Sequence, residues 1–169
     1  MRNYDEKARA MGANYFASFD GFPGWTVVSA EKRFRVNIGA YPFVGIADLV
    51  LRNNEDGKLM VVDHKTKAPD AMKNGMNLFR HQLYIYAEHV RQEYGEYPAI
   101  LAFNMIRTGE MITEDFDEER LAETVKWAAD TIEAICLDFD YEPHVDDFHC
   151  RFLCNVRGTC PHCPVYIPG

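Results

Sequence analysis

VGIAD (residues 44–48) and LMVVDHK (residues 59–65) are two apolar stretches that decide the fold, and a segment rich in turn-forming residues separates them. Each stretch carries an aspartate, Asp48 or Asp63, where a buried strand would ordinarily carry Val or Ile. Lys65 follows two residues after the second aspartate. The Asn, Asp and Gly residues of 53–58 favour a turn between antiparallel strands. The sequence therefore predicts a hairpin that brings two acids and a lysine together.

Two registers of this hairpin are compatible with the turn residues. A two-residue turn at Asp56-Gly57 would place Asp48 opposite Lys65, whereas a four-residue loop would place Asp48 opposite Asp63. In both registers Asp48 lies roughly 5–7 Å from the polar residues of the second strand. Asp63 and Lys65 share one face because side chains alternate along a strand, and His64 faces the other way.

The paired acids predict a metal site. Two ionised carboxylates in an apolar setting repel each other and lose hydration, so a cation has to join them. Mg²⁺ and Mn²⁺ suit oxygen ligands, and the expected ligands are Asp48, Asp63 and the backbone carbonyl of His64. Lys65 would polarise an attacking water or neutralise charge on a phosphate. The alternative is a closed salt bridge between Lys65 and one aspartate.

A long helix is predicted from about Met72 to Tyr94, because apolar residues recur at helical spacing at Phe79, Leu83, Tyr86 and Val90. Gln82 and Tyr86 are four residues apart and so lie on one face. An amide beside an apolar stripe needs hydrogen-bond partners. A metal-bound water, a carboxylate or a nucleotide would serve, and the alternative partner is the backbone.

Together these residues resemble the PD-(D/E)XK nuclease superfamily, in particular its RecB-like branch, which includes CRISPR-associated RecB-like nucleases and phage exonucleases. The matching motifs are G-x-x-D at 45–48, D-x-K-T at 63–66 and Q-x-x-x-Y at 82–86. The resemblance implies that Asp48 and Asp63 are metal ligands and that Lys65 is the catalytic lysine. It also implies that Gln82 and Tyr86 support the site or contact DNA. For the branch's upstream acid, the candidate here is Glu31.

A cysteine cluster near the C-terminus predicts a second metal site, formed by Cys150, Cys154, Cys160 and Cys163. Close thiols flanked by Arg151, Arg157 and His162 would favour thiolates and a soft metal, either zinc or an iron–sulfur cluster. The resemblance implies a 4Fe–4S cluster, with Cys163 replacing the branch's upstream cysteine, since no cysteine precedes Cys136. Two disulfides are the structural alternative, but no signal peptide and an odd number of cysteines argue against them.

Length and composition predict one intracellular domain. The chain has 169 residues, 47% of them hydrophobic, and no apolar run reaches transmembrane length. A cytoplasmic protein of bacterial or phage origin is expected. The expected helices and strands are helix Tyr4–Phe19, strands Trp25–Ile38, Pro42–Arg52 and Lys58–Thr66, helix Met72–Tyr94, strand Ala99–Arg107 and helix Asp117–Asp138. Cys136 is expected in the core, on the apolar face of the last helix.

This order predicts an α/β sandwich with a central mixed sheet flanked by helices. The resemblance implies that this sandwich is restriction-endonuclease-like. One nuclease domain would span residues 1–169. It would comprise an N-terminal helical segment (1–24), a nuclease core (25–139) and a cysteine-rich metal-binding segment (140–169).

The net charge of −8 is unevenly distributed. Residues 110–147 contain 14 acids and 2 basic residues, a net charge of −12, so the rest of the chain carries +4. Several basic residues near the motifs or the cysteines would follow a phosphate backbone: Lys58, Lys67, Lys73, Arg80, Arg151 and Arg157.

The predicted function is a Mg²⁺- or Mn²⁺-dependent DNA nuclease, with exonuclease action expected on single- or double-stranded DNA. DNA repair, recombination, phage or CRISPR-type processing is the expected context, with a helicase or recombinase as a possible partner. One alternative is a catalytically silent nuclease-fold module that binds nucleic acid or protein and is stabilised by zinc or an iron–sulfur cluster. Another is a zinc-stabilised structural domain.

Overall fold

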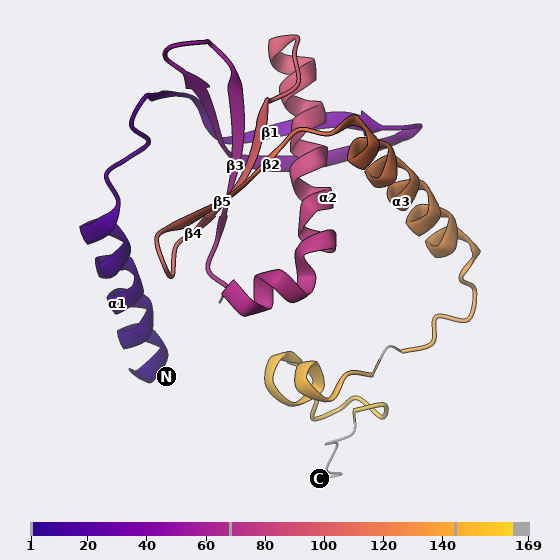
Figure 1. The fold of residues 1–169 in the computed structure, drawn as a ribbon. Helices are drawn as coiled ribbons and strands as arrows, with labels where there is room; N and C mark the ends of the chain where they lie inside the picture. The colour runs from indigo at the N-terminus through magenta and orange to yellow at the C-terminus, as the bar shows by residue number, and fades with distance from the viewer. Residues whose placement is uncertain (1, 68, 144, 164–169) are drawn as a thin grey trace. The chain divides into compact units, whose positions relative to one another are not determined.

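The computed structural model describes residues 2–67, 69–143 and 145–163 (Figure 1). In chain order its elements are α1 (Arg2–Ser18), β1 (Trp25–Ile38), β2 (Tyr41–Asn53), β3 (Leu59–Lys65), α2 (Pro69–Tyr94), β4 (Ile100–Met105), β5 (Glu110–Asp115), α3 (Glu118–Leu137) and a π-helical turn, η1 (His149–Leu153). The chain forms two compact units, Met1–Thr131 and Ile132–Gly169.

The first unit contains a five-stranded mixed sheet in the order β1-β2-β3-β4-β5. β3 and β4 are parallel, and the other neighbouring strands are antiparallel. A parallel pair needs a long crossover, which α2 provides between β3 and β4. The mixed sheet flanked by helices confirms the predicted α/β architecture.

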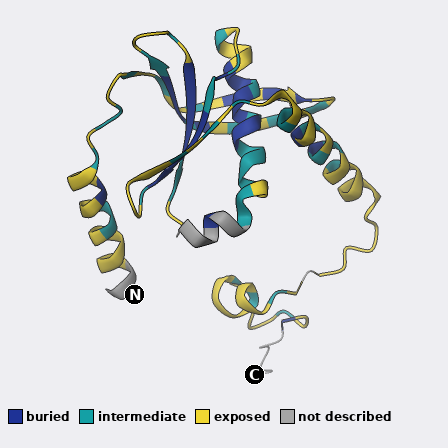
Figure 2. Ribbon diagram, viewed as in Figure 1, coloured by how far each residue is buried: buried dark blue, intermediate teal, exposed yellow. Residues whose placement is uncertain are grey.

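The central strands are largely buried (Figure 2). Their alternate residues fill two apolar layers. Val61 of β3 and Leu101 of β4 belong to the layer under α2, together with Leu83 and Val90 of that helix. Residues of the opposite parity form the second layer, which includes Val62, Met60, Leu51, Leu49, Ala102, Phe22 and Trp25. Because both faces of β3 are covered, a charged residue on this strand is buried.

Strand β5 was not predicted from the sequence. Its residues, Glu110–Asp115, lie within the acidic stretch, and only Ile112 packs against the core. It pairs with β4 at the edge of the sheet, from Ile100↔Asp115 to Met105↔Glu110. The backbone pairing with β4 therefore holds β5 in place, and no strong apolar pattern in its sequence marks it as a strand.

The second unit contains the end of α3 and η1. Cys136 is exposed, and Phe139 retains 76% of its accessible surface, so the expectation that Cys136 lies in the core was wrong. The apolar stripe of α3 packs on the core only through its first turns, at Leu121, Val125 and Ala128. Among the described residues, no helix is long and apolar enough to cross a membrane.

Candidate active site

The β2–β3 connection is a four-residue loop, so the two-residue alternative is wrong. The Asn53 backbone N–H donates to the Lys58 carbonyl over 2.8 Å. Gly57 within the loop has a φ of 76°, a left-handed conformation that glycine adopts without steric cost. The paired residues Val50↔Val61 and Leu49↔Val62 fix the register, and the next position along the ladder brings Asp48 opposite Asp63.

A chain of polar contacts joins β3 to α2. The Nζ of Lys65 lies 2.6 Å from Oδ2 of Asp63 and donates to Oε1 of Gln82 over 2.7 Å. The Nε2 of Gln82 then donates to the hydroxyl of Tyr86 over 2.7 Å. The predicted shared face of Asp63 and Lys65 and that of Gln82 and Tyr86 are both confirmed. The amide has side-chain partners and does not depend on the backbone.

Asp63 is the most constrained residue of this chain of contacts. Its exposed fraction is 2%, and this burial raises the pKa of the Asp63 carboxyl. The Lys65 ammonium opposes the rise, while the Asp48 carboxylate adds to it. Although Lys65 forms a close ion pair with Oδ2, this buried oxygen has no hydrogen bond of good geometry within the described residues. The Lys65–Asp63 ion pair is what the closed salt-bridge alternative predicts, and a divalent cation would in addition offset the repulsion between the Asp63 and Asp48 carboxylates.

Asp48 is held beside Asp63 by the backbone, since its Oδ2 accepts the N–H of His64 over 2.8 Å. The imidazole of His64 turns to the other face, as predicted, where its Nδ1 lies 3.2 Å from Nδ2 of Asn104. The same Asn104 amide donates to the hydroxyl of Tyr15 on α1 over 2.6 Å. The His64 ring thus helps to attach α1 to the sheet, and its backbone carbonyl stays a predicted ligand.

Glu31 occupies the position of β1 opposite Asp48, between the pairs Ala30↔Leu49 and Lys32↔Ala47. Its φ is 48°, in the left-handed region that a non-glycine residue rarely adopts. Such strain often occurs at functional sites. The side chain is exposed, so it is accessible to solvent beside the aspartate pair.

The two aspartates suit a hard divalent cation. Mg²⁺ is commonly bound through one or two carboxylates, with waters and substrate phosphates completing its shell. Asp48 and Asp63 provide such a pair, and a cation bound there would share Oδ2 of Asp63 with the Lys65 ammonium. No group of three or more His, Cys, Asp or Glu side chains in the described part of the chain is arranged to hold a metal ion. Waters, phosphate or backbone oxygens would therefore supply the other ligands.

Comparison with known proteins identifies the family of this chain. A family model described as the PD-(D/E)XK nuclease superfamily matches residues 2–161. The chain belongs to the PD-(D/E)XK nuclease superfamily. Among solved structures it is similar to the crystal structure of SSO0001, with 21% sequence identity and a TM-score of 0.43, covering 96% of this chain and 78% of that chain. No curated protein matches the chain.

The C-terminal cysteines of this PD-(D/E)XK protein are only partly gathered. All are free thiols; Cys163 is buried, and its Sγ lies 3.9 Å from the carbonyl oxygen of Cys150. Desolvation raises the pKa of Cys150, and the sulfurs of Cys163 and Cys154 add to the rise. The thiolate character and the metal site predicted for the four cysteines stay predictions. Arg151, one of the cations expected beside them, pairs with Asp147 at 2.9 Å.

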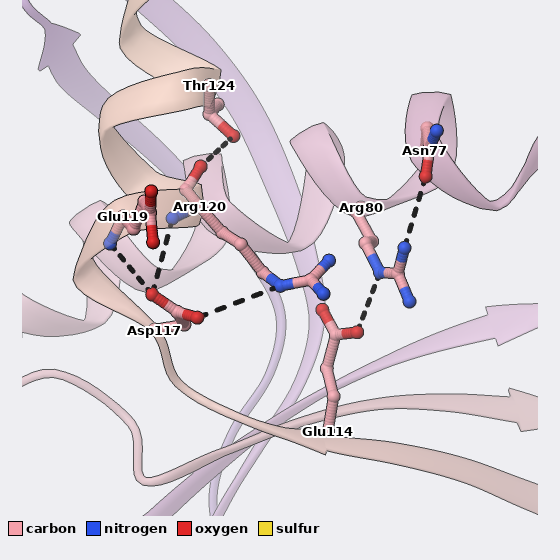
Figure 3. Close-up of polar contacts among 7 residues, drawn as sticks. All are labelled: Asn77, Arg80, Glu114, Asp117, Glu119, Arg120 and Thr124. Carbon is pink, nitrogen blue, oxygen red and sulfur yellow. Dashed lines mark hydrogen bonds and ion pairs between the residues drawn. The ribbon is translucent and has the colours of Figure 1, made fainter.

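A polar pocket of about 560 Å³ lies between α2 and the start of α3 (Figure 3). Arg80 donates to Glu114 over 2.7 Å, and Arg120 lies 3.8 Å from Asp117. Arg80 was expected to follow a phosphate backbone, but its guanidinium is neutralised by the Glu114 carboxylate. Among the other residues predicted to do so, Lys58 pairs with Asp56 at 3.1 Å, and the side chain of Lys73 lies outside the described residues.

Proposed function

We propose that this protein is a Mg²⁺- or Mn²⁺-dependent DNA nuclease of the RecB-like branch. Membership of the superfamily already implies a nuclease that acts on nucleic acid. The observation that carries the finer proposal is the buried Asp63 carboxylate, whose Oδ2 lies 2.6 Å from the Lys65 Nζ while Asp48 lies opposite it. Asp48 and Asp63 would hold the ion, and Lys65 would act on the attacking water or the phosphate.

When bound, the divalent ion would supply Lewis acidity and promote deprotonation of a water. The protein's own contribution is positioning and charge. The Lys65 ammonium is fixed between the Asp63 carboxylate and the Gln82 amide oxygen, so it is oriented before a substrate arrives. A positioned cationic donor stabilises the negative charge that develops on a phosphate in the transition state.

Tyr86 would act as a neutral donor in this site. Burial raises the pKa of Tyr86 to about 12, and the nearby Asp63 and Asp48 carboxylates contribute to the rise. The hydroxyl therefore stays protonated at neutral pH. It accepts the Gln82 amide, so its own proton is free to be donated to a carboxylate or to a phosphate oxygen.

Glu31 is proposed as a further acid of the site. Its position opposite Asp48 and its left-handed backbone support this role. The proposal also retains exonuclease action in DNA repair, recombination, phage or CRISPR-type processing, which the RecB-like motifs support. A 4Fe–4S cluster at the cysteines, or zinc in its place, belongs to the same proposal and is supported by the four thiols within 14 residues.

The test is cleavage of end-labelled linear and closed circular DNA with Mn²⁺ or with EDTA. We expect cleavage only with the metal, and loss of cleavage in Asp63→Asn, which has nearly the shape of the wild-type side chain but lacks its charge. Val27→Ala, at an exposed position of β1, is the matched control and should cut normally. A folded, metal-replete wild type that binds DNA without cutting would replace this proposal with the binding-module alternative. Cleavage of linear but not circular DNA would support exonuclease action.

A further inference from the structure

An apolar groove of about 270 Å³ lies directly beside the proposed catalytic residues. Gln82 and Tyr86 form part of its wall, and the same Gln82 amide contacts Lys65. The groove is formed by β1, β2, α2 and α3, all within the first compact unit. Anything bound in it would therefore be adjacent to the Asp63–Lys65 pair.

The groove is lined by aromatic rings, of which Phe34 is buried and Phe43 and Trp127 are half-buried. Phe34, Phe43 and Trp127 line it, and Val44 on its rim retains 55% of its accessible surface. Gly45 is required at its base, because a Cβ there would lie 2.6 Å from the Phe34 ring. Aromatic faces and exposed aliphatic groups suit a planar apolar ligand such as a nucleobase.

The groove and the neighbouring polar pocket also differ in the charged side chains that line them. His81 lines both hollows and stacks on Trp127 with ring centroids 4.4 Å apart. The pocket on one side of this stack is lined by Asp117, Glu119 and Glu123 together with Arg80 and Arg120, so acidic and basic side chains are mixed there. None of the described residues lining the groove is acidic, so the groove presents no carboxylate that would repel a nucleic acid.

We propose that the groove holds an unstacked base of single-stranded DNA while an adjacent phosphate lies at Asp48, Asp63 and Lys65. This inference rests on the proposed nuclease function and specifies its substrate. Bases within a duplex are stacked and paired, so their faces are not available to an aromatic side chain.

The binding test uses Trp127 as a fluorescent reporter. The chain has two tryptophans, so Trp25→Phe leaves Trp127 as the only one. In EDTA, where no metal-dependent cleavage occurs, we expect a single-stranded oligodeoxynucleotide to quench this emission and a duplex of the same length to have little effect. Phe43→Leu keeps apolar volume but removes an aromatic face, and it should weaken binding roughly 5- to 150-fold. Val27→Ala serves again as the exposed apolar control.

A second arm uses the wild-type chain and modified substrates, so it does not depend on any variant folding. Replacing single nucleotides near the scissile bond by abasic residues should slow cleavage at one position and have little effect at the others. Equal quenching by duplex, tighter binding of RNA of the same sequence, or uniform tolerance of abasic residues would overturn the inference. Cleavage without a Trp127 response would refute the groove alone. A Trp127 response without cleavage would refute the nuclease proposal.

Discussion

The β2–β3–α2 site and the C-terminal cysteine segment are both rich in potential ligands, but they are organised differently. In the first, Asp63 is buried, and its neighbours Asp48, Lys65 and Gln82 are each fixed by a hydrogen bond or an ion pair. In the second, Cys163 is the one buried cysteine, and the others lie in short turns or in η1. A site on paired strands is organised by the burial of the sheet, whereas the proposed metal site in the cysteine segment would acquire its order only when a metal binds.

Replacement of Lys65 is expected to have the largest effect on cleavage and tests whether the organised site is the catalytic one. We expect Lys65→Ala to lower kcat about 10²- to 10³-fold with little change in KM, because a donor aligned for the transition state is lost. Single-turnover cleavage in Mn²⁺ measures the change. Lys126→Ala is the matched control, since Lys126 is exposed and pairs with Asp130 at 2.7 Å on the surface of α3. A normal rate in Lys65→Ala would show that the organised site is not catalytic.

Removing the residue that orients Lys65 should have a smaller effect. Gln82→Ala is expected to lower the cleavage rate about 10- to 100-fold. Loss of a residue that orients the groups of a metal site through a hydrogen bond typically lowers activity by such a factor. Tyr86→Phe retains the ring in the apolar groove and removes only the hydroxyl, so its loss should be smaller. The same kinetic assay separates the two variants. Equal losses would place the hydroxyl, and not the amide, at the centre of the network.

The core should also lose stability on acidification. His89 is buried against the Phe34 ring, and burial lowers the pKa of His89 below its ordinary value of 6.5. Glu93 raises this pKa and Lys32 lowers it. Because the folded state binds the proton less readily than the unfolded state, stability falls as the pH drops below 6.5, by at most about 1.4 kcal/mol per pH unit from this residue.

Urea denaturation between pH 7.5 and 5.5 measures this dependence. His89→Phe removes the titrating group while keeping an aromatic ring against Phe34, so we expect a flatter stability profile in the variant. A profile as steep as that of the wild type would assign the dependence to another group, such as His81, whose pKa burial also lowers.

A substitution in the cysteine segment should have the smallest effect on the stability of the first unit. Cys150→Ser is expected to reduce bound iron or zinc and to increase protease cleavage after residue 131. The free energy of unfolding of the first unit should change by less than about 0.5 kcal/mol. Metal analysis of anaerobically purified protein and limited proteolysis test this. If the variant unfolded the sheet as well, the two regions would be one cooperative structure.

Much of the first region could be predicted from the sequence, because strand alternation and helical spacing act locally. These rules give the shared face of Asp63 and Lys65, and the pairing of Gln82 with Tyr86. The turn residues left two registers open, since only the completed ladder decides between Asp63 and Lys65 as the neighbour of Asp48.

The features that were missed depend on tertiary packing. The contact of Asn104 with Tyr15 joins residues 89 positions apart, and its one sequence signal is a polar residue in an otherwise apolar strand. Cys136 lies on the same helical face as the residues of α3 that pack on the core, but this part of α3 no longer contacts the core. Glu31 could be named as a candidate acid, yet its left-handed backbone opposite Asp48 is visible only once β1 and β2 are paired.

Binding of Mn²⁺ to the metal-free protein tests the central claim most directly. Electron paramagnetic resonance of free Mn²⁺, measured with wild type and with Asp48→Asn and Asp63→Asn, reports binding without any requirement for cleavage. We predict that the wild type removes Mn²⁺ from solution and that each variant binds it at least about tenfold more weakly. Equal binding by all three proteins would contradict the assignment of Asp48 and Asp63 as the metal site.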